Sequence, residues 1–223
     1  MATTQQPIRD VEWTRARDIR RELASETKDR LIVAAKTVFA QKGYDAATIG
    51  DISSAAGVSR PTYYVYFASK AEVFQVIAEQ IKDDVLEAHH HQGPMADDPV
   101  LVSQASLAGF IRLYSENLEI LEEIDKRAGV DPEIAALLDI IRGKPLRRTL
   151  RHIESLRRAG LAHPLVDEDY AAKVMGAVSM DAAADVRADP SRFDYCVDQT
   201  TRTYLAVIGF VGDLSALDAA STE

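Results

Sequence analysis

The sequence predicts an all-α fold in which a small N-terminal helix-turn-helix unit precedes a larger C-terminal helical bundle. Three observations support this fold class. Apolar residues recur at helical spacing along most of the chain, no segment of useful length alternates with the period of a β-strand, and the turn Gly57-Val58-Ser59 separates two short helical segments. The chain has 223 residues, of which 47% are hydrophobic. This suffices for one large domain or two smaller ones.

The first two helices are expected at residues 27–42 and 48–55. Apolar side chains in the first segment repeat at the spacing of one helical face; they are Leu31, Ala34, Ala35, Val38 and Phe39. Gly43 stands where a helix commonly ends, and Thr48 is well placed to cap the second helix. These two helices form the first half of the expected helix-turn-helix.

The third and fourth helices follow a tight turn. Gly57 can adopt the left-handed conformation that such a turn requires, Ser59 can cap the next helix, and Pro61 suits the first turn of that helix. Ser69 then caps a fourth helix, and we expect Phe67 to lie in the core. The apolar stripe of the fourth helix consists of Val73, Phe74, Ile77, Ile81 and Val85.

The remainder of the chain predicts further helices at 101–128, 132–159, 167–188 and 191–211. We therefore divide the chain into three regions: a flexible basic N-terminal arm (1–26), a helix-turn-helix domain (27–72) and a helical bundle (73–223). The arm contains several arginines, which suit either a solvated tail or a segment that touches nucleic acid.

Charge is distributed unevenly along the chain. The net charge is −9, but residues 1–70 hold 11 Lys and Arg against 8 Asp and Glu, a balance of +3, and the remaining residues carry −12. The longest apolar run, 205–212, is far too short for a membrane helix, and the N-terminus lacks the apolar core of a secretory signal. The single cysteine, Cys196, allows no internal disulfide. We expect a cytoplasmic protein without a membrane segment.

The stretch GVSRPTYYVYFASK at 57–70 crowds three tyrosines between two cations. A tyrosine hydroxyl can donate to a phosphate oxygen, and Arg60 at the start of a helix can reach guanine in a major groove as a bidentate donor. Tyr64 and Tyr66 lie about 200° apart on a helix, so both cannot face the core. This pattern favours a nucleic-acid-binding surface.

Residues 30–74 resemble the DNA-binding domain of the TetR family of transcriptional regulators. The shared pattern runs in order over some 45 residues, and includes Gly43-Tyr44, Thr48, the run Ala56-Gly57-Val58-Ser59, Tyr64 and Ser69-Lys70. The segment SRPTYYVYFASK is most similar to the EthR-like branch. The resemblance implies a homodimer on a palindromic double-stranded DNA operator, with repression as the usual role. The chain contains no Gly-rich phosphate loop, nucleophile elbow or HExxH motif, so we expect no enzymatic activity.

The resemblance also implies which residues contact DNA. Phosphate contacts are expected from Thr48, Ser59, Tyr64, Tyr66 and Lys70, base contacts from Arg60, Pro61 and Thr62, and either kind from Tyr63. Gly50 departs from the family pattern, since some members carry a long side chain there that reaches a base. Base reading would then rest on Arg60 and Thr62.

By the same resemblance, the C-terminal bundle binds an effector and forms the dimer. Phe110, Tyr114 and Leu118 make an apolar stripe that suits either plain core or a pocket, and Met175 and Ser179 suit an adaptable cavity. We expect a small apolar effector, with no cofactor and no metal. The dimer interface is expected along the last two helices, at Tyr204, Leu205, Ile208 and Val211.

Two other functions stay open at this point. A DNA-binding architectural protein that responds to no ligand would need a more basic surface than a net charge of −9 suggests. A helical-bundle metalloenzyme would use Glu87 and His90 as Glu-x-x-His, but the chain holds no second copy of this motif. The operator, the effector and the direction of regulation are not encoded in any recognisable pattern.

Overall fold

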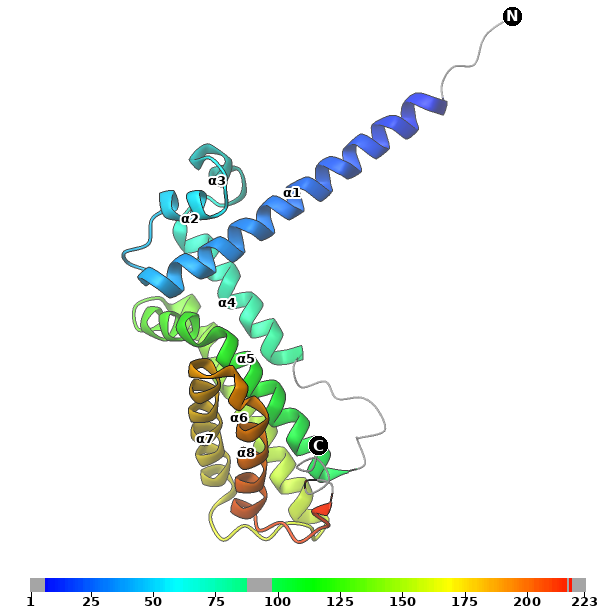
Figure 1. Cartoon of the computed structure of the whole chain (residues 1–223), viewed down its shortest axis with the longest axis vertical. Helices are drawn as coiled ribbons and strands as arrows, with labels where there is room; N and C mark the ends of the chain where they lie inside the picture. The colour runs from blue at the N-terminus through cyan, green and yellow to red at the C-terminus, as the bar shows by residue number, and fades with distance from the viewer. Residues whose placement is uncertain (1–6, 88–97, 216, 218–223) are drawn as a thin grey trace, which may run out of the picture. The chain divides into compact units, whose positions relative to one another are not determined.

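The computed structural model describes residues 7–87, 98–215 and 217, with side chains from residue 25 onward. The chain divides into two compact units, Met1–Ile77 and Ala78–Glu223, called here the N-terminal and C-terminal units. The described residues form helices joined by turns and contain no strand beyond one isolated bridge between Ala162 and Phe210 (Figure 1). The predicted all-α fold is therefore confirmed.

The N-terminal unit contains α1 (Pro7–Lys42), α2 (Ile49–Ala55), α3 (Arg60–Tyr66) and the start of α4 (Lys70–Glu87). The helix expected at 27–42 begins much earlier, at Pro7, because residues 8–42 include neither glycine nor a second proline to interrupt it. Of the predicted arm, residues 1–6 lie outside the described residues. The flexibility of that arm stays a prediction.

Local chemistry sets the ends of α2 and α3 as expected. Thr48 accepts a hydrogen bond from the amide of Asp51, whose carboxylate accepts one from the Thr48 amide, which makes a capping box. Ser59 caps α3 by accepting a bond from the amide of Thr62. Gly57 adopts a φ of 66°, so the turn uses the conformation that glycine supplies without strain.

The core of the N-terminal unit is aromatic at its centre. Phe39 of α1 is fully buried, with its ring centroid 5.3 Å from that of Phe74 in α4 and 5.5 Å from that of Tyr44. The predicted stripe of α1 is buried, as is Phe67. α1, the loop after it, the residue that ends α3 and the start of α4 thus contribute to one small core.

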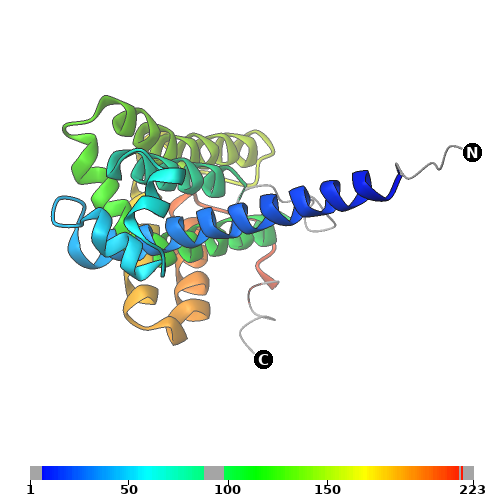
Figure 2. The same ribbon diagram turned by 90° about the horizontal axis from the view of Figure 1, so that it is seen from above.

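The C-terminal unit contains the rest of α4 and the helices α5 (Pro99–Ala128), α6 (Pro132–Arg158), α7 (Glu168–Ala188) and α8 (Phe193–Val207), with the short 3-10 helix η2 (Pro190–Arg192) before α8. Each of α5, α6 and α7 packs against the other two, and α8 packs against α5 and α7 (Figures 1 and 2). Asp98, Asp131 and Asp167 cap α5, α6 and α7 through their carboxylates. No helix in the described ranges is long and apolar enough to cross a bilayer.

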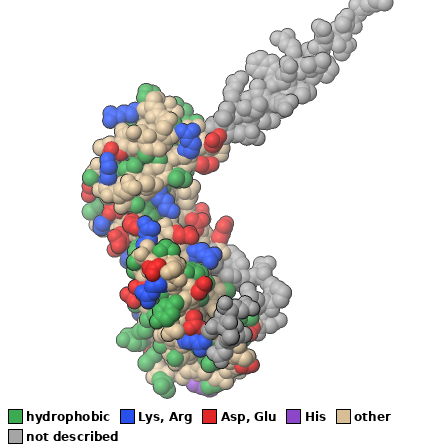
Figure 3. Space-filling model, viewed as in Figure 1, with side chains coloured by type: hydrophobic (Ala, Val, Ile, Leu, Met, Phe, Trp, Pro, Cys, Tyr) green, Lys and Arg blue, Asp and Glu red, His purple; other side chains and the backbone are tan. Residues whose placement is uncertain are grey.

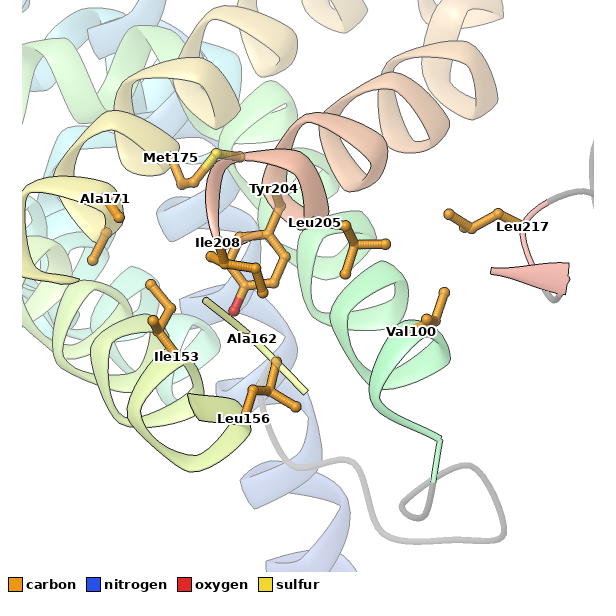
Figure 4. Packing of buried hydrophobic residues seen from close by; sticks show 11 residues of the cluster. Val100, Ile153, Leu156, Ala162, Ala171, Met175, Tyr204, Leu205, Ile208 and Leu217 are labelled. Atoms are coloured by element: carbon orange, nitrogen blue, oxygen red, sulfur yellow. The ribbon is translucent and has the colours of Figure 1, made fainter. Parts of the chain in front are cut away.

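The core of this unit corrects the predicted dimer interface. Tyr204, Leu205 and Ile208 are each at most 4% exposed, and they belong to one core cluster with residues of α5, α6 and α7 of the same chain (Figure 4). The expectation was wrong because an apolar stripe shows that a helix face is buried but not by which chain. Val211, at 61% exposed, is the one predicted interface residue that lies on the surface.

The connection between α6 and α7 is tied to the segment after α8. The amide of His163 donates to the carbonyl of Gly209, and the amide of Val211 donates to the carbonyl of Leu161. Gly209 has a φ of 60° and lies so close to His163 that a Cβ atom there would overlap the His163 carbonyl oxygen. Glycine is therefore required at this position for both conformation and space.

Candidate nucleic-acid interface and ligand cavity

The outward face of α3 carries the side chains most available for contact. Arg60 and Pro61 are exposed, Tyr64 is 56% exposed, and Val65 is 77% exposed. Tyr66 and Thr62 are half-buried. At least one of Tyr64 and Tyr66 was expected to be exposed, and this is confirmed. Val65 was missed, although it lies four residues after Pro61 and so shares its face.

Arg60 lies over the start of α2, in space that Gly50 leaves open. A Cβ atom at Gly50 would overlap the guanidinium of Arg60. The absence of a side chain at position 50 therefore leaves room for Arg60, the residue that was predicted from the sequence to contact a base. The first turns of α2 and α3 meet at this pair of residues.

The start of α2 is polar and partly anionic. The hydroxyl of Thr48 donates to Asp51 at 2.7 Å, and Lys42 donates to the same carboxylate, also at 2.7 Å. The bond from Lys42, followed by those from Thr48, lowers the pKa of Asp51 to about 2. Thr48 is exposed, but its hydroxyl already belongs to the cap, as does that of Ser59.

Tyr63 does not face outward. Its side chain is fully buried, and its hydroxyl donates to the carbonyl of Ser69 at 2.9 Å. Burial raises the pKa of this phenol above its ordinary value. The predicted DNA contact by Tyr63 is therefore wrong, because the residue occupies the core face of α3 together with Phe67, four positions later.

Lys70 has a role that the sequence did not reveal. Its ammonium donates to the carbonyls of Tyr44, Ala47 and Asp45 at 2.6, 2.9 and 3.3 Å, and lies 4.4 Å from the centre of the Tyr44 ring. An ammonium has three donors, and these three carbonyls engage them. In this structure Lys70 holds the loop between α1 and α2 instead of presenting a free charge to a phosphate.

On the face drawn in Figure 3, the described part of the N-terminal unit carries its cations singly. The face seen in Figure 3 shows separate Lys and Arg side chains with a few acidic ones between them, and no continuous basic patch. Nucleic-acid binding through this face would therefore depend on individually placed contacts more than on bulk attraction.

A cavity of about 400 Å³ lies within the C-terminal unit, between α5, α6 and α7, with Tyr204 of α8 in its wall. Four of the five predicted effector contacts line it: Phe110, Tyr114, Met175 and Ser179. Leu118 does not, so this part of the expectation is wrong; it lies one turn of α5 beyond Tyr114. Phe110 and Tyr114 stack with ring centroids 4.0 Å apart.

Apart from Ser179, sequence reasoning missed the following polar residues of the cavity. Its lining includes the cations Arg142, Arg148 and Lys173, the hydroxyl residues Ser103, Ser106, Ser179 and Thr149, and His152, but no Asp or Glu. These residues belong to no motif and come from three helices, so only the fold brings them together. The one local signal is the four-residue spacing of Arg148 and His152 on α6.

His152 is held at one end of this polar group. Its Nε2 lies 3.1 Å from Oγ of Ser103, which itself donates to the carbonyl of Pro99. Burial, and secondly the positive charge of Arg148, lower the pKa of His152. The ring is therefore uncharged near neutral pH.

Replacement of His152 by glutamine is expected to flatten the dependence of stability on pH. The pKa of His152 in the folded state lies below its unfolded value of about 6.5. The contribution of the uncharged ring to stability is therefore fully present above about pH 6.5, and it is lost as the pH falls from there toward the folded pKa. Urea unfolding at pH 7 and pH 5 should show a smaller loss for His152→Gln than for the parent chain. His163→Gln, an exposed control, should keep the parent slope; equal slopes in all three chains would contradict this prediction.

The described residues offer no evident metal site. No group of three or more His, Cys, Asp or Glu side chains among them is arranged to hold an ion. Glu87 ends α4, whereas His90 of the alternative Glu-x-x-His pair lies outside the described residues.

Comparison with known proteins identifies relatives of part of the chain. A family model described as bacterial regulatory proteins, tetR family, matches residues 31–77. The HTH-type transcriptional activator FasR of Mycolicibacterium smegmatis is 36% identical over 61 residues, which cover 27% of this chain and 28% of FasR. The HTH-type transcriptional repressor BepR of Brucella suis is 25% identical over 123 residues, covering 52% of this chain and 57% of BepR. The matched segments thus span little more than half of these relatives at most.

Similarity of fold extends over more of the chain. The crystal structure of a bacterial regulatory protein in the tetR family from Rhodococcus RHA1 has a TM-score of 0.69 at 21% identity, covering 83% of this chain and 98% of that one. Salmonella enterica GusR has a TM-score of 0.62 at 18% identity, covering 82% and 95%. At these identities the likeness concerns the fold.

Proposed function

Because residues 31–77 match the family model described as bacterial regulatory proteins, tetR family, we propose that this chain is a ligand-responsive transcriptional regulator that binds a palindromic operator as a homodimer. The single observation that carries the proposal is the outward face of α3, where Arg60, Tyr64 and Val65 project from a short helix capped at Ser59. Such a helix can enter a major groove and present its first residues to base edges. A DNA operator as partner places the protein in the cytoplasm.

In this proposal the contacts to DNA divide into two kinds. Arg60, Pro61, Thr62 and Val65 face bases, and Tyr64 and Tyr66 donate to phosphates, with Thr48 and Ser59 adding contacts from the capped helix starts. Tyr63 is left out because it is buried. Repression is the direction we propose, as in BepR, whose match is twice as long as that of the activator FasR.

The dimer surface proposed here is the exposed side of α7 and α8. Tyr170 and Met180 of α7 and Tyr195 of α8 are 60%, 43% and 59% exposed, and Val211 follows α8 with 61%. Large apolar side chains on neighbouring helices suit burial against a second copy. Light scattering of the purified chain over a range of concentrations tests the proposal, and a monomer at every concentration would rule it out.

The cavity of the C-terminal unit is the proposed effector site. Its volume of about 400 Å³ falls within the range of about 300–1,000 Å³ that is usual for small-molecule sites. An effector that binds one arrangement of the dimer more tightly than another shifts the population toward the tightly bound arrangement. The size of this shift is limited by the difference between the two affinities. α4 continues from the N-terminal into the C-terminal unit, so it is the element through which such a shift would reach the helix-turn-helix.

Replacement of Arg60 by alanine tests the proposed function. Loss of a bidentate contact to a guanine should weaken binding to a selected operator by about 1–3 kcal/mol and relax preference at one symmetric position. The measurement is selection of bound DNA from a random pool, followed by fluorescence anisotropy with the enriched sequence. Lys126→Ala removes the same charge from an exposed site in the C-terminal unit and should bind as the parent does.

Two outcomes would count against this reading. Failure of the parent chain to enrich any sequence at moderate salt would contradict operator binding. Equal losses for Arg60→Ala and Lys126→Ala would show that overall charge, not base reading, sets the affinity.

The ligand-independent architectural alternative is disfavoured by the cavity and the net charge of −9. The relatives above do not single out the EthR-like branch, which stays a prediction.

A further inference from the structure

Arg148 differs from the other two cations that line the cavity, because both of those form ion pairs. Of the three cations that line the cavity, Arg142 pairs with Asp125 at 2.9 Å and Lys173 pairs with Asp169 at 2.5 Å. Within the described part of the chain, Arg148 makes no ion pair and no hydrogen bond. A half-buried guanidinium without a partner is costly, and it remains charged at any physiological pH.

Two hydroxyls that line the same cavity as Arg148 also lack hydrogen-bond partners among the described residues. α5 and α6 form an antiparallel helical hairpin, and the contact of Ser103 with His152 sets their register. One helical turn further along α5, and one turn back along α6, the same register brings Ser106 opposite Thr149. Both line the cavity, and neither hydroxyl forms a hydrogen bond to a described residue. Arg148 precedes Thr149 on α6 and lines the same cavity, so one guanidinium and two free hydroxyls face a common space.

Apolar side chains from three helices also line the cavity. They include Leu107 and Phe110 of α5, Leu146 of α6 and Met175 of α7, and a Cβ atom at Gly176 would meet nothing within 4 Å, so space extends to the backbone of α7. No carboxylate faces this space. A cation and free hydroxyl donors that share one cavity with apolar side chains match a molecule with an anionic head and an apolar body.

We propose that the cavity binds an amphipathic monocarboxylate, whose acid group pairs with Arg148 and accepts bonds from Ser106 and Thr149, and whose apolar body lies along Leu107, Phe110 and Met175. A carboxylate fits the planar fork of a guanidinium through two parallel hydrogen bonds. A single unpaired cation balances the single charge of such an acid. This inference names the chemical class of the effector and rests on the proposed function only where it concerns regulation of DNA binding.

Three ten-carbon probes test the class of ligand. Decanoate, 1-decanol and decylamine share one apolar body and differ in the head group, which is anionic, neutral or cationic at pH 7. Calorimetric titration of the full-length chain, below micellar concentrations, should show decanoate binding at least about tenfold more tightly than decanol, because charge-assisted hydrogen bonds exceed neutral ones by roughly that factor. Decylamine should not bind.

Two arginine variants on the same helix locate the acid group. Arg148→Gln should reduce the affinity for decanoate to that for decanol and leave decanol binding unchanged. Arg151→Gln is the matched control, because Arg151 is exposed, lies outside the cavity and carries the same charge. Arg148→Lys keeps the cation and should retain part of the preference for decanoate. Circular dichroism of both variants, together with the result for Arg148→Lys, would reveal a folding defect that is specific to the glutamine variant.

The possible failures are distinguishable. Decanol binding as tightly as decanoate, equal effects of the Arg148 and Arg151 glutamine variants, or no binding of decanoate would each overturn the inference. Binding is measured without DNA, so these outcomes leave the proposed DNA-binding function untouched. Conversely, decanoate that binds through Arg148 but does not release the operator in an anisotropy assay would uphold the ligand class and overturn its role as effector.

Discussion

Replacement of Phe39 by alanine is expected to destabilise the N-terminal unit by about 3–5 kcal/mol, the usual cost of removing a buried phenylalanine. The side chain is fully buried, and its ring lies within 5.5 Å of those of both Tyr44 and Phe74, centre to centre. The two neighbouring rings belong to the loop after α1 and to α4, so neither can close the gap without moving the backbone. The cavity would therefore remain largely open.

This loss should abolish DNA binding, because it is comparable to the whole stability of a small domain. Urea denaturation followed by circular dichroism measures the change in unfolding free energy, and anisotropy with the selected operator measures binding. Val33→Ala is the control on the same helix, since Val33 is 65% exposed and should change stability by no more than about 0.5 kcal/mol. A loss below about 1 kcal/mol for Phe39→Ala would contradict the tight packing described here.

The second large effect is expected at Gly209. Alanine there should destabilise the C-terminal unit by roughly 2–5 kcal/mol, since a left-handed alanine costs about 1–2 kcal/mol and a steric overlap in packed surroundings adds about 1–3 kcal/mol. The overlap is with the backbone carbonyl of His163, which cannot turn aside as a flexible side chain could. The hydrogen bonds between the segments 161–163 and 209–211 would be strained first.

Gly160 provides a matched control for this substitution. Its φ of 73° is also left-handed, but a Cβ atom there would meet nothing within 4 Å. Gly160→Ala should therefore cost only the conformational part, about 1–2 kcal/mol. Urea unfolding of the two variants separates conformation from contact, and equal losses at both positions would show that the approach to His163 has no energetic importance.

Much of the fold could be predicted because its signals are local. Thr48 and Ser59 cap the helices that they precede, and Gly57 takes the conformation that its turn needs. Tyr63 could have been assigned correctly as well, since it lies one helical turn before Phe67, which was already expected in the core. Treating three adjacent tyrosines as one surface concealed this difference between them.

Other features depend on tertiary structure alone. The buried face of α8 is apolar whether it meets its own chain or a second copy, so Tyr204 and Ile208 could not be assigned from their spacing. Arg148 and Ser106 lie 42 positions apart on different helices and belong to no motif. Only the packing of α5 against α6 shows that their side chains line the same space.

The tie between the α6–α7 connection and the segment after α8 has a practical consequence for engineering this chain. Leu217, beyond that tie, is 1% exposed and belongs to the bundle core. Phe210 and Leu217 thus add to the hydrophobic interior from beyond the last helix, although nothing in their sequence marks them as essential. An affinity tag or fluorescent fusion is best joined after Leu217. A fusion to a chain truncated at the end of α8 would lack Leu217 and so part of the core.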